Sequence, residues 1–130
     1  MELARHAHGV FTVDTQVATP AAWDGGAMSH TRLVKTFTGE MAGSGVVESI
    51  MLKVDGDGPA AYVGLELIDC TLEQRRGTFL LMHAATANGS EQAGSWTIVP
   101  GSGTGELRAI RGRFQILEDH AFILDYDLDG

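Results

Sequence analysis

The side chains best suited by type and spacing to chemistry are a lysine, two glutamates and a histidine in four consecutive segments: Lys35, Glu48, Glu66 and His83. If two carboxylates lie side by side in a buried site, their pKa values are pushed apart and one stays protonated beside an ionised partner. Such a pair can act as acid and base on a bound substrate, and a histidine beside it can orient or exchange the proton. The alternative is a polar network that holds strand register, or a solvated outer face, because structural ion networks perturb pKa values as active sites do.

The elements that must position these residues are β-strands. Short β-rich runs alternate with glycine-rich breaks, no long helical period is present, and 17 of the 130 residues are glycine. About eight strands with short links are typical of an up-and-down barrel or a sandwich, and closure would remove exposed edges. We therefore predict one all-β domain over residues 1–130, a closed antiparallel barrel of about eight strands, lipocalin-like in outline. The predicted strands cover residues 8–13, 30–38, 46–54, 60–72, 77–87, 96–99, 106–116 in two pieces and 120–128, with a loop over 14–26.

Turn positions predict how the hairpins align. Centring the hairpin after the third segment on the DGDGP turn places Glu48 opposite Glu66, and the next hairpin, centred at residues 74–75, places Glu66 opposite His83. The connection before the third segment sets Lys35 beside Glu48. The four residues then form one row across four strands, in which each carboxylate has a basic neighbour. A slip of one residue in any hairpin would break the row, because side chains then change faces.

The two faces of this sheet differ in composition. The face with the row also holds the aromatic residues Phe37, Tyr62 and Phe79, so we predict that it is the barrel interior and that these rings contact a ligand. The opposite face is apolar over two strands, and an exposed apolar patch of that kind indicates a subunit interface and a homo-oligomer. The residues of that patch are Val63, Leu65, Leu67, Leu80 and Met82.

Charge and composition exclude several classes of partner. The formal net charge of −8 repels phosphate backbones and anionic lipid surfaces, so we expect no nucleic-acid and no membrane partner. Cys70 is the only cysteine, which rules out an intrachain disulfide. The opening segment has no apolar run of signal-peptide length, and we expect a cytoplasmic location.

Other patterns favour structure over chemistry. The glycine-rich segment 100–106 lacks the Gly-Lys-Ser/Thr ending of a phosphate-binding loop, so we interpret it as a tight crossing of the backbone. His6 and His8 share a strand face without a third ligand at metal spacing, and the alternating aspartates of segment 125–129 are typical of a solvated face. Trp96, within a predicted strand, is typical of a core residue. We predict no metal and no cofactor.

Five segments of the sequence form a recognisable set: VKTFTGE (34–40), YVGLE (62–66), RGTFLLMH (76–83), WTIVPGSGTGEL (96–107) and LDYDL (124–128). Together they resemble a bacterial family catalogued as domain of unknown function 3224. The resemblance spans nearly the whole chain, and it implies the allene-oxide-cyclase-like barrel shared with plant cyclases and dirigent proteins. It supports the fold rather than an activity, because the family has no settled one, and it carries over no active-site residue.

Two functions are compatible with these residues. The first is binding of a small, partly apolar organic ligand inside the barrel, among Phe37, Tyr62 and Phe79. The second is an acid–base enzyme, a cyclase, isomerase or carboxylate-assisted hydrolase, that uses Glu48, Glu66 and His83. An oligomeric structural protein is a third alternative. Whether the protein is an enzyme stays open at this stage.

Overall fold

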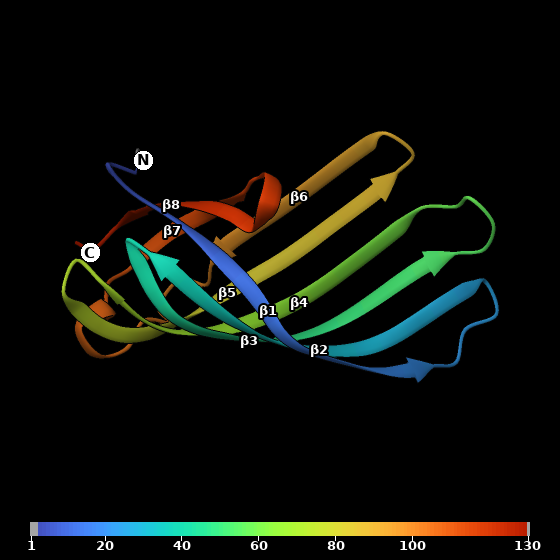
Figure 1. Cartoon of the computed structure of the whole chain (residues 1–130), viewed down its shortest axis with the longest axis horizontal. Helices are drawn as coiled ribbons and strands as arrows, with labels where there is room; N and C mark the ends of the chain where they lie inside the picture. Colours follow the sequence, from blue (N-terminus) through green and yellow to red (C-terminus); the bar gives the residue numbers. More distant parts are fainter. Residues whose placement is uncertain (1–2, 130) are drawn as a thin grey trace.

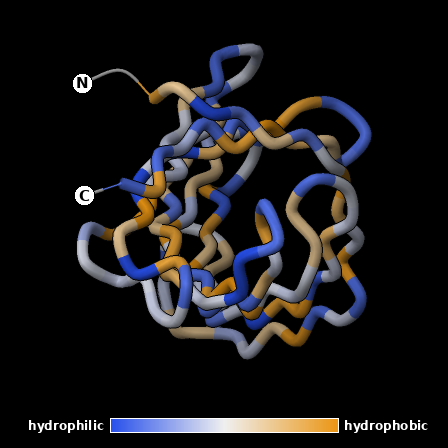
Figure 2. The backbone as a smooth tube through the Cα atoms, turned by 90° about the vertical axis from the view of Figure 1, so that its left-hand side faces the viewer, coloured by the Kyte–Doolittle hydropathy of each residue, from blue (hydrophilic) through white to orange (hydrophobic). Residues whose placement is uncertain are grey.

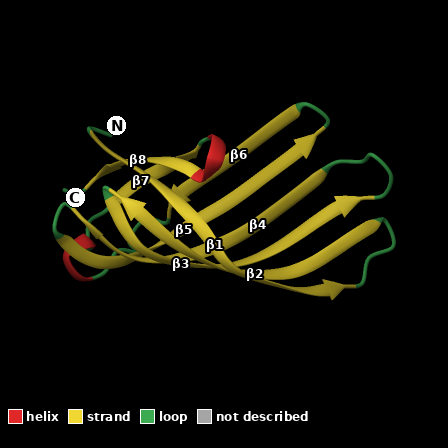
Figure 3. Cartoon of the chain, viewed as in Figure 1, coloured by secondary structure: helices red, strands yellow, loops and turns green. Residues whose placement is uncertain are grey.

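The computed structural model describes residues 3–129 and contains eight antiparallel strands that close into a barrel in sequence order (Figures 1 and 3). The predicted fold class is therefore confirmed. Two short 3-10 turns, η1 (Gly105–Leu107) and η2 (Glu118–His120), interrupt the last third of the chain. The strands are β1 (Arg5–Ala21), β2 (Gly26–Gly39), β3 (Met41–Val54), β4 (Ala60–Leu72), β5 (Arg75–Asn88), β6 (Glu91–Ile98), β7 (Arg111–Ile116) and β8 (Ala121–Asp127).

The barrel is closed along only part of its length, because β7 and β8 are shorter than the other strands. In Figure 1 both lie at the end that holds the two termini, while β1 to β6 continue towards the other end. β8 pairs with residues 5–10 of β1, and β6 pairs with β7 through Thr97 and Arg113. Beyond these pairs the six long strands continue as one curved sheet. Figure 2, viewed from the closed end, shows the strands arranged as a ring.

β1 extends through most of the segment that the sequence predicts as a loop. Residues 15–21 pair with β2 after a bulge at Asp14, so the loop prediction is wrong there. Residues 12–20 are all exposed, and the alternation that marks a half-buried strand is therefore missing. Pro20 is tolerated because this stretch of β1 has β2 on one side and needs no backbone donor on the other.

The predicted registers of β3 are wrong on both sides. Lys35 pairs with Gly45 where Glu48 was predicted, a slip of three residues, and Glu48 pairs with Leu65 where Glu66 was predicted, a slip of one. Both slips are odd, so β3 presents the opposite face to the interior. The three-residue slip arises because the glycine-rich segment 41–45 resembles a loop in sequence but forms part of β3. The one-residue slip arises at the next turn, whose centre lies between Gly56 and Asp57 rather than on Asp57.

The hairpin between β4 and β5 is displaced by two residues from its predicted register. Glu66 pairs with Leu81, and His83 pairs with Gly64, so Glu66 and His83 are diagonal neighbours on one face. An even slip keeps the face, which is why the prediction of an inward Glu66 and His83 holds. The turn is centred on Glu73 and Gln74, both with positive φ (51° and 64°), as a two-residue hairpin turn requires. The usual Asn-Gly or Asp-Gly signal is absent there, so the turn centre was misplaced.

The solid core fills the closed end of the barrel. The Phe122 ring packs edge-on against Phe37 at a centroid distance of 5.6 Å, and it stacks with Phe114 at 5.3 Å. The turn η1 covers the base of the barrel and buries Leu107 completely. Gly77 makes this approach possible, because a Cβ there would collide with the backbone oxygen of Thr104.

We predict that Leu107→Ala lowers the free energy of unfolding by about 2–5 kcal/mol, because it leaves a cavity under η1. Leu117→Ala is the matched control, since Leu117 is 44% exposed and its truncation leaves no cavity. Urea denaturation followed by circular dichroism measures both variants. Equal stability of the two would show that η1 does not seal the core.

Candidate functional site

The inward side chains of β2 to β6 stack in layers along the barrel, and each layer takes one residue from each strand. The lowest layer that bears on the site carries Glu66, the next carries His83, and the one nearest the open end carries Tyr62. In strand order these layers are Leu33, Val47, Glu66, Leu81 and Ile98; Thr31, Ser49, Gly64, His83 and Trp96; and Ser29, Met51, Tyr62, Ala85 and Gly94.

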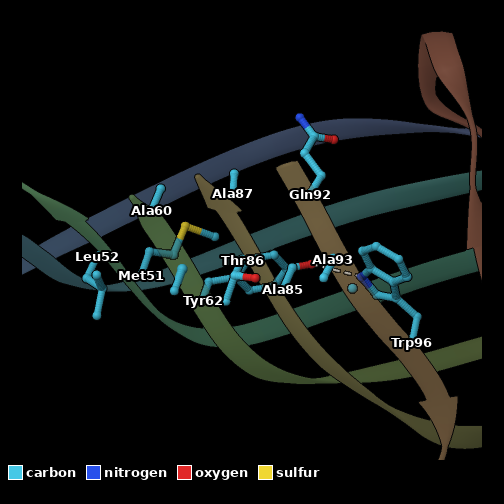
Figure 4. Close-up of a pocket in the computed structure, with 12 residues that line it drawn as sticks. Met51, Leu52, Ala60, Tyr62, Ala85, Thr86, Ala87, Gln92, Ala93 and Trp96 are labelled. Atoms are coloured by element: carbon cyan, nitrogen blue, oxygen red, sulfur yellow. Dashed lines mark hydrogen bonds between the residues drawn. The ribbon is translucent and has the colours of Figure 1, made fainter. Parts of the chain in front are cut away.

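The open end of the barrel contains a trough with a volume of about 580 Å³. Its lining comes from β3, β4, β5 and β6 and is rich in alanine, so the strands leave space between them that larger side chains would fill (Figure 4). None of the described lining residues carries a charge. The polar groups are the Tyr62 hydroxyl, the Trp96 indole N–H, Thr86 and Gln92.

A continuous chain of hydrogen bonds leads from this trough into the core. Trp96 Nε1–H donates to the Tyr62 hydroxyl at 2.9 Å, as the dashed line in Figure 4 marks. The Tyr62 hydroxyl lies 3.1 Å from His83 Nδ1, and His83 Nε2 lies 2.8 Å from Glu66 Oε1. Lys35 Nζ lies 3.5 Å from the same carboxylate oxygen. Four of the barrel's strands thus contribute to one polar cluster.

One tautomer of His83 gives every hydrogen bond of the chain a donor and an acceptor. The indole of Trp96 can only donate, so the Tyr62 oxygen accepts and its own hydrogen is free to point to His83. A neutral His83 with its hydrogen on Nε2 then accepts from Tyr62 at Nδ1 and donates to the Glu66 carboxylate. Each donor has one acceptor, and the Nδ1 lone pair of His83 is directed at a hydroxyl that lines the trough.

The charges of the cluster balance inside the protein. Glu66 is 1% exposed and Lys35 is 9% exposed, and an unpaired ion at either depth would be strongly destabilising. The ammonium of Lys35 also lies 4.7 Å from the centre of the Phe11 ring, a favourable cation–π contact. No described residue hydrogen-bonds Glu66 Oε2. Gly45 provides the space for this oxygen, since a Cβ at position 45 would collide with it.

Tyr62 is held in its protonated form. Burial raises the pKa of its phenol, the nearby Glu66 carboxylate adds to this effect, and the hydrogen bond from Trp96 partly opposes it. The phenol therefore enters the cluster as a hydroxyl that can donate to His83 and accept from the trough side.

Glu48 is not part of this cluster, and the predicted row of four residues is wrong at that position. Its side chain is 49% exposed on the outer face, where it accepts from Arg32 Nε at 2.9 Å and lies 3.4 Å from His30 Nε2. The one-residue slip between β3 and β4 puts Val47 rather than Glu48 inside. A Glu48–Glu66 acid–base pair is thereby excluded.

The three predicted ligand-contacting rings separate in the structure. Tyr62 lines the trough, whereas Phe37 (3% exposed) and Phe79 (0% exposed) are packed in the core below it. Sequence reasoning missed that Tyr62 is hydrogen-bonded to His83 and that Trp96 is its second partner. A signal was present for Tyr62, because Tyr62 and Glu66 are four residues apart on one strand and so share its inner face.

The remaining candidates of the sequence occupy structural positions. The segment 100–106 crosses the base of the barrel, and Thr104 N donates to Thr78 O at 2.8 Å. His6 Nδ1 lies 2.6 Å from Asp125 Oδ1, so one of the predicted solvated aspartates is a buried ion-pair partner. Burial raises the pKa of the Cys70 thiol to about 12, which makes it a poor nucleophile.

Within residues 3–129 no group of three or more His, Cys, Asp or Glu side chains is placed to hold a metal ion. In the same residues no helix has the length and apolar character needed to cross a membrane.

The comparisons with known proteins agree with this architecture. The chain belongs to the family described as protein of unknown function (DUF3224), whose model matches residues 7–129. It is similar to a crystal structure of a protein of unknown function from this family, from Shewanella oneidensis MR-1, with 25% identity and a TM-score of 0.83. The similarity covers 97% of this chain and 98% of that one. No curated protein matches the chain.

We predict that Lys35→Met lowers the free energy of unfolding by about 3–5 kcal/mol at neutral pH, because it leaves the Glu66 carboxylate without its cation. The loss should be much smaller in a Glu66→Gln background, where no buried carboxylate needs the Lys35 ammonium. Chemical denaturation of the two single variants and the double variant measures the coupling. Arg108→Met, at an exposed cation outside the cluster, is the control and should have little effect in either background. An equal loss from Lys35→Met in both backgrounds would contradict the role of charge.

Proposed function

We propose that this protein binds a small, neutral and mainly apolar organic molecule in the trough at the open end of its barrel. The observation that carries the proposal is the trough itself, about 580 Å³ of space that the strands leave open above a closely packed core. Ligand sites of this size are mostly apolar and carry a few well-placed polar groups, as the Tyr62 hydroxyl is placed here.

The chemistry of the lining selects the ligand class. Alanine, methionine and aromatic side chains provide apolar contact surface, and burying a ligand against them is favourable by about 25 cal/mol per Å². A charged ligand would lose its hydration without gaining an ion partner, because none of the described lining residues is charged. The protein's net charge of −8 further disfavours an anion.

The test uses the neutral dye Nile red and two leucine substitutions on β5. Ala85 points into the trough, whereas Ala84, its neighbour along the strand, lies on the outer face and lines a second groove of about 460 Å³. We expect Ala85→Leu to weaken dye binding at least several-fold because it fills the trough, and Ala84→Leu to leave binding unchanged. Fluorescence titration gives both affinities. Loss of binding in Ala84→Leu alone would place the dye on the outer face and refute the proposal.

We also propose that the outer apolar face forms the interface of a homo-oligomer. The predicted patch is exposed on four of its five residues: Val63 is 57% exposed, Leu65 47%, Leu67 47% and Met82 51%. β3 adds Ile50, 42% exposed, to it. Arg32 and Glu48 lie beside Ile50 as an ion pair of 2.9 Å, so they present no net charge to a second copy related by a twofold axis.

Leu65→Lys should disrupt this interface, because it places a charge in the middle of the apolar patch, and should convert the assembly to monomers. Val17→Lys is the control, since Val17 is 63% exposed on β1, away from the patch. Sedimentation velocity measures the oligomeric state of both variants. A monomeric wild-type protein, or a Leu65→Lys variant that keeps the wild-type assembly, would refute the interface.

A further inference from the structure

We propose that Tyr62, His83 and Glu66 form a proton relay that takes a proton from an enol or phenol hydroxyl of the molecule bound in the trough, and returns it. This inference rests on the proposed function, because the trough must first hold a ligand. It adds a chemical activity and a narrower ligand class, neutral and mainly apolar hydroxyl compounds.

The hydrogen-bonding capacity of Tyr62 selects a ligand that donates. Its oxygen accepts one hydrogen bond from Trp96 at 2.9 Å. With the hydrogen of a neutral His83 on Nε2, the Tyr62 hydroxyl donates its own hydrogen to His83 Nδ1 at 3.1 Å. The second lone pair of the Tyr62 oxygen, on the trough side, can therefore still accept a hydrogen bond. A ligand hydroxyl completes the set by donating to it, whereas a ketone or ether oxygen would face another oxygen with no hydrogen between them.

Proton transfer along the chain needs only small movements of hydrogen atoms. The ligand O–H bond breaks and a new O–H bond forms on Tyr62, while the former Tyr62 proton moves to His83 Nδ1. The electron pair stays on the ligand as an oxyanion, and His83 becomes an imidazolium. Glu66, 2.8 Å from His83 Nε2, stabilises that cation as a hydrogen-bonded carboxylate. The reverse steps restore the relay, so no oxidant, reductant or co-reactant is consumed.

The arrangement favours a proton shift within one molecule over hydrolysis. The other polar side chains that line the trough, Thr86 and Gln92, do not exchange protons near neutral pH. The same phenol must therefore both take the proton and give it back, and returning it to a carbon atom converts an enol to its ketone. Hydrolysis would need one group to activate water and another to protonate the leaving group. Among the described lining residues Tyr62 would have to do both.

The experiment uses 2-naphthol, a neutral and mainly apolar hydroxyl compound whose hydroxyl becomes strongly acidic in its excited state. Displacement of Nile red first establishes that 2-naphthol occupies the trough. The ratio of naphtholate to naphthol emission of the bound molecule then reports whether a protein group accepts its proton. We expect substantial naphtholate emission from the wild-type complex.

Three variants break the relay without emptying the trough. Tyr62→Phe removes the first acceptor, His83→Gln keeps hydrogen-bonding groups that cannot take up a proton, and Glu66→Gln removes the charge that stabilises the imidazolium. Each should reduce the emission ratio several-fold at saturating 2-naphthol. His30→Gln is the matched control, because His30 faces outward beside Glu48, and it should leave the ratio unchanged. Tyr62 is only half-buried, so Tyr62→Phe keeps the test decisive even where a substitution of the buried residues unfolds the protein.

The emission ratio and the displacement assay distinguish failure of the relay from failure of ligand binding. A ratio that falls in Tyr62→Phe and His83→Gln but not in His30→Gln supports the relay. A ratio that is equal in the wild type and His83→Gln overturns it, because solvent is then the acceptor. If Nile red binds the trough but 2-naphthol does not displace it, the ligand-binding proposal stands and the hydroxyl class inferred here is wrong.

Discussion

The carboxylate of Glu66 imposes the main electrostatic constraint on this barrel. A single ionised group at 1% exposure is strongly destabilising unless it is paired and hydrogen-bonded, and both partners must come from other strands. Lys35 comes from β2 and His83 from β5, on either side of the β3–β4 pair. Only a sheet that curls in one register brings them to the same carboxylate. The charge therefore ties four strands together at the level where the solid core ends.

The constraint extends from Glu66 towards the open end of the barrel. One ring nitrogen of His83 is hydrogen-bonded to Glu66. Its other nitrogen is buried and also needs a partner, which is the Tyr62 hydroxyl. Tyr62 in turn is fixed by Trp96 of β6. A buried charge that requires compensation thus orders a hydroxyl at the floor of a cavity. The same bonds that satisfy the interior also prepare a group that can contact a ligand.

Side-chain size explains why one end of the barrel is filled and the other is open. Phenylalanine and leucine occupy the layers below Glu66, where β7 and β8 complete the wall. Above it, the inward positions of β5 and β6 carry residues such as Ala85, Ala87 and Gly94, and the strands there extend past β7 and β8. Small side chains on strands without a covering partner leave a trough, because nothing else reaches the space.

The sheet is apolar on both faces over β4 and β5, so the pattern of apolar and polar residues does not show which face is inside the barrel. On β4 the inward positions include the polar Glu66, while the outward Leu65 and Leu67 are each 47% exposed. A rule that places leucine inside and glutamate outside would invert this strand. The aromatic residues of the same face, Tyr62 on β4 and Phe79 on β5, were the better guide, and the structure places Phe79 in the core.

The sequence by itself determined that the chain is a closed antiparallel barrel and that Tyr62, Glu66 and His83 share a face. The first follows from the number of predicted strands and from the short connections between them. The second follows from alternation along β4, a local property with a period of two residues, together with a β4–β5 hairpin whose slip is even. Family membership, now established by the match over residues 7–129, was also visible in short segments of sequence.

Only the tertiary structure decided how the strands slide past one another. Register depends on turn geometry, such as the positive φ of Glu73 and Gln74. It also depends on whether a glycine-rich stretch such as 41–45 joins a strand or forms a loop. Residue types alone reveal neither. That is why Glu48, in the predicted row with Glu66, lies in solvent beside Arg32, while Lys35 reaches Glu66 directly. It also decided the hydrogen bond between Tyr62 and Trp96, because their contact requires β4, β5 and β6 to be aligned at once. Alternation is local to one strand, but a site assembled across strands depends on every register between them.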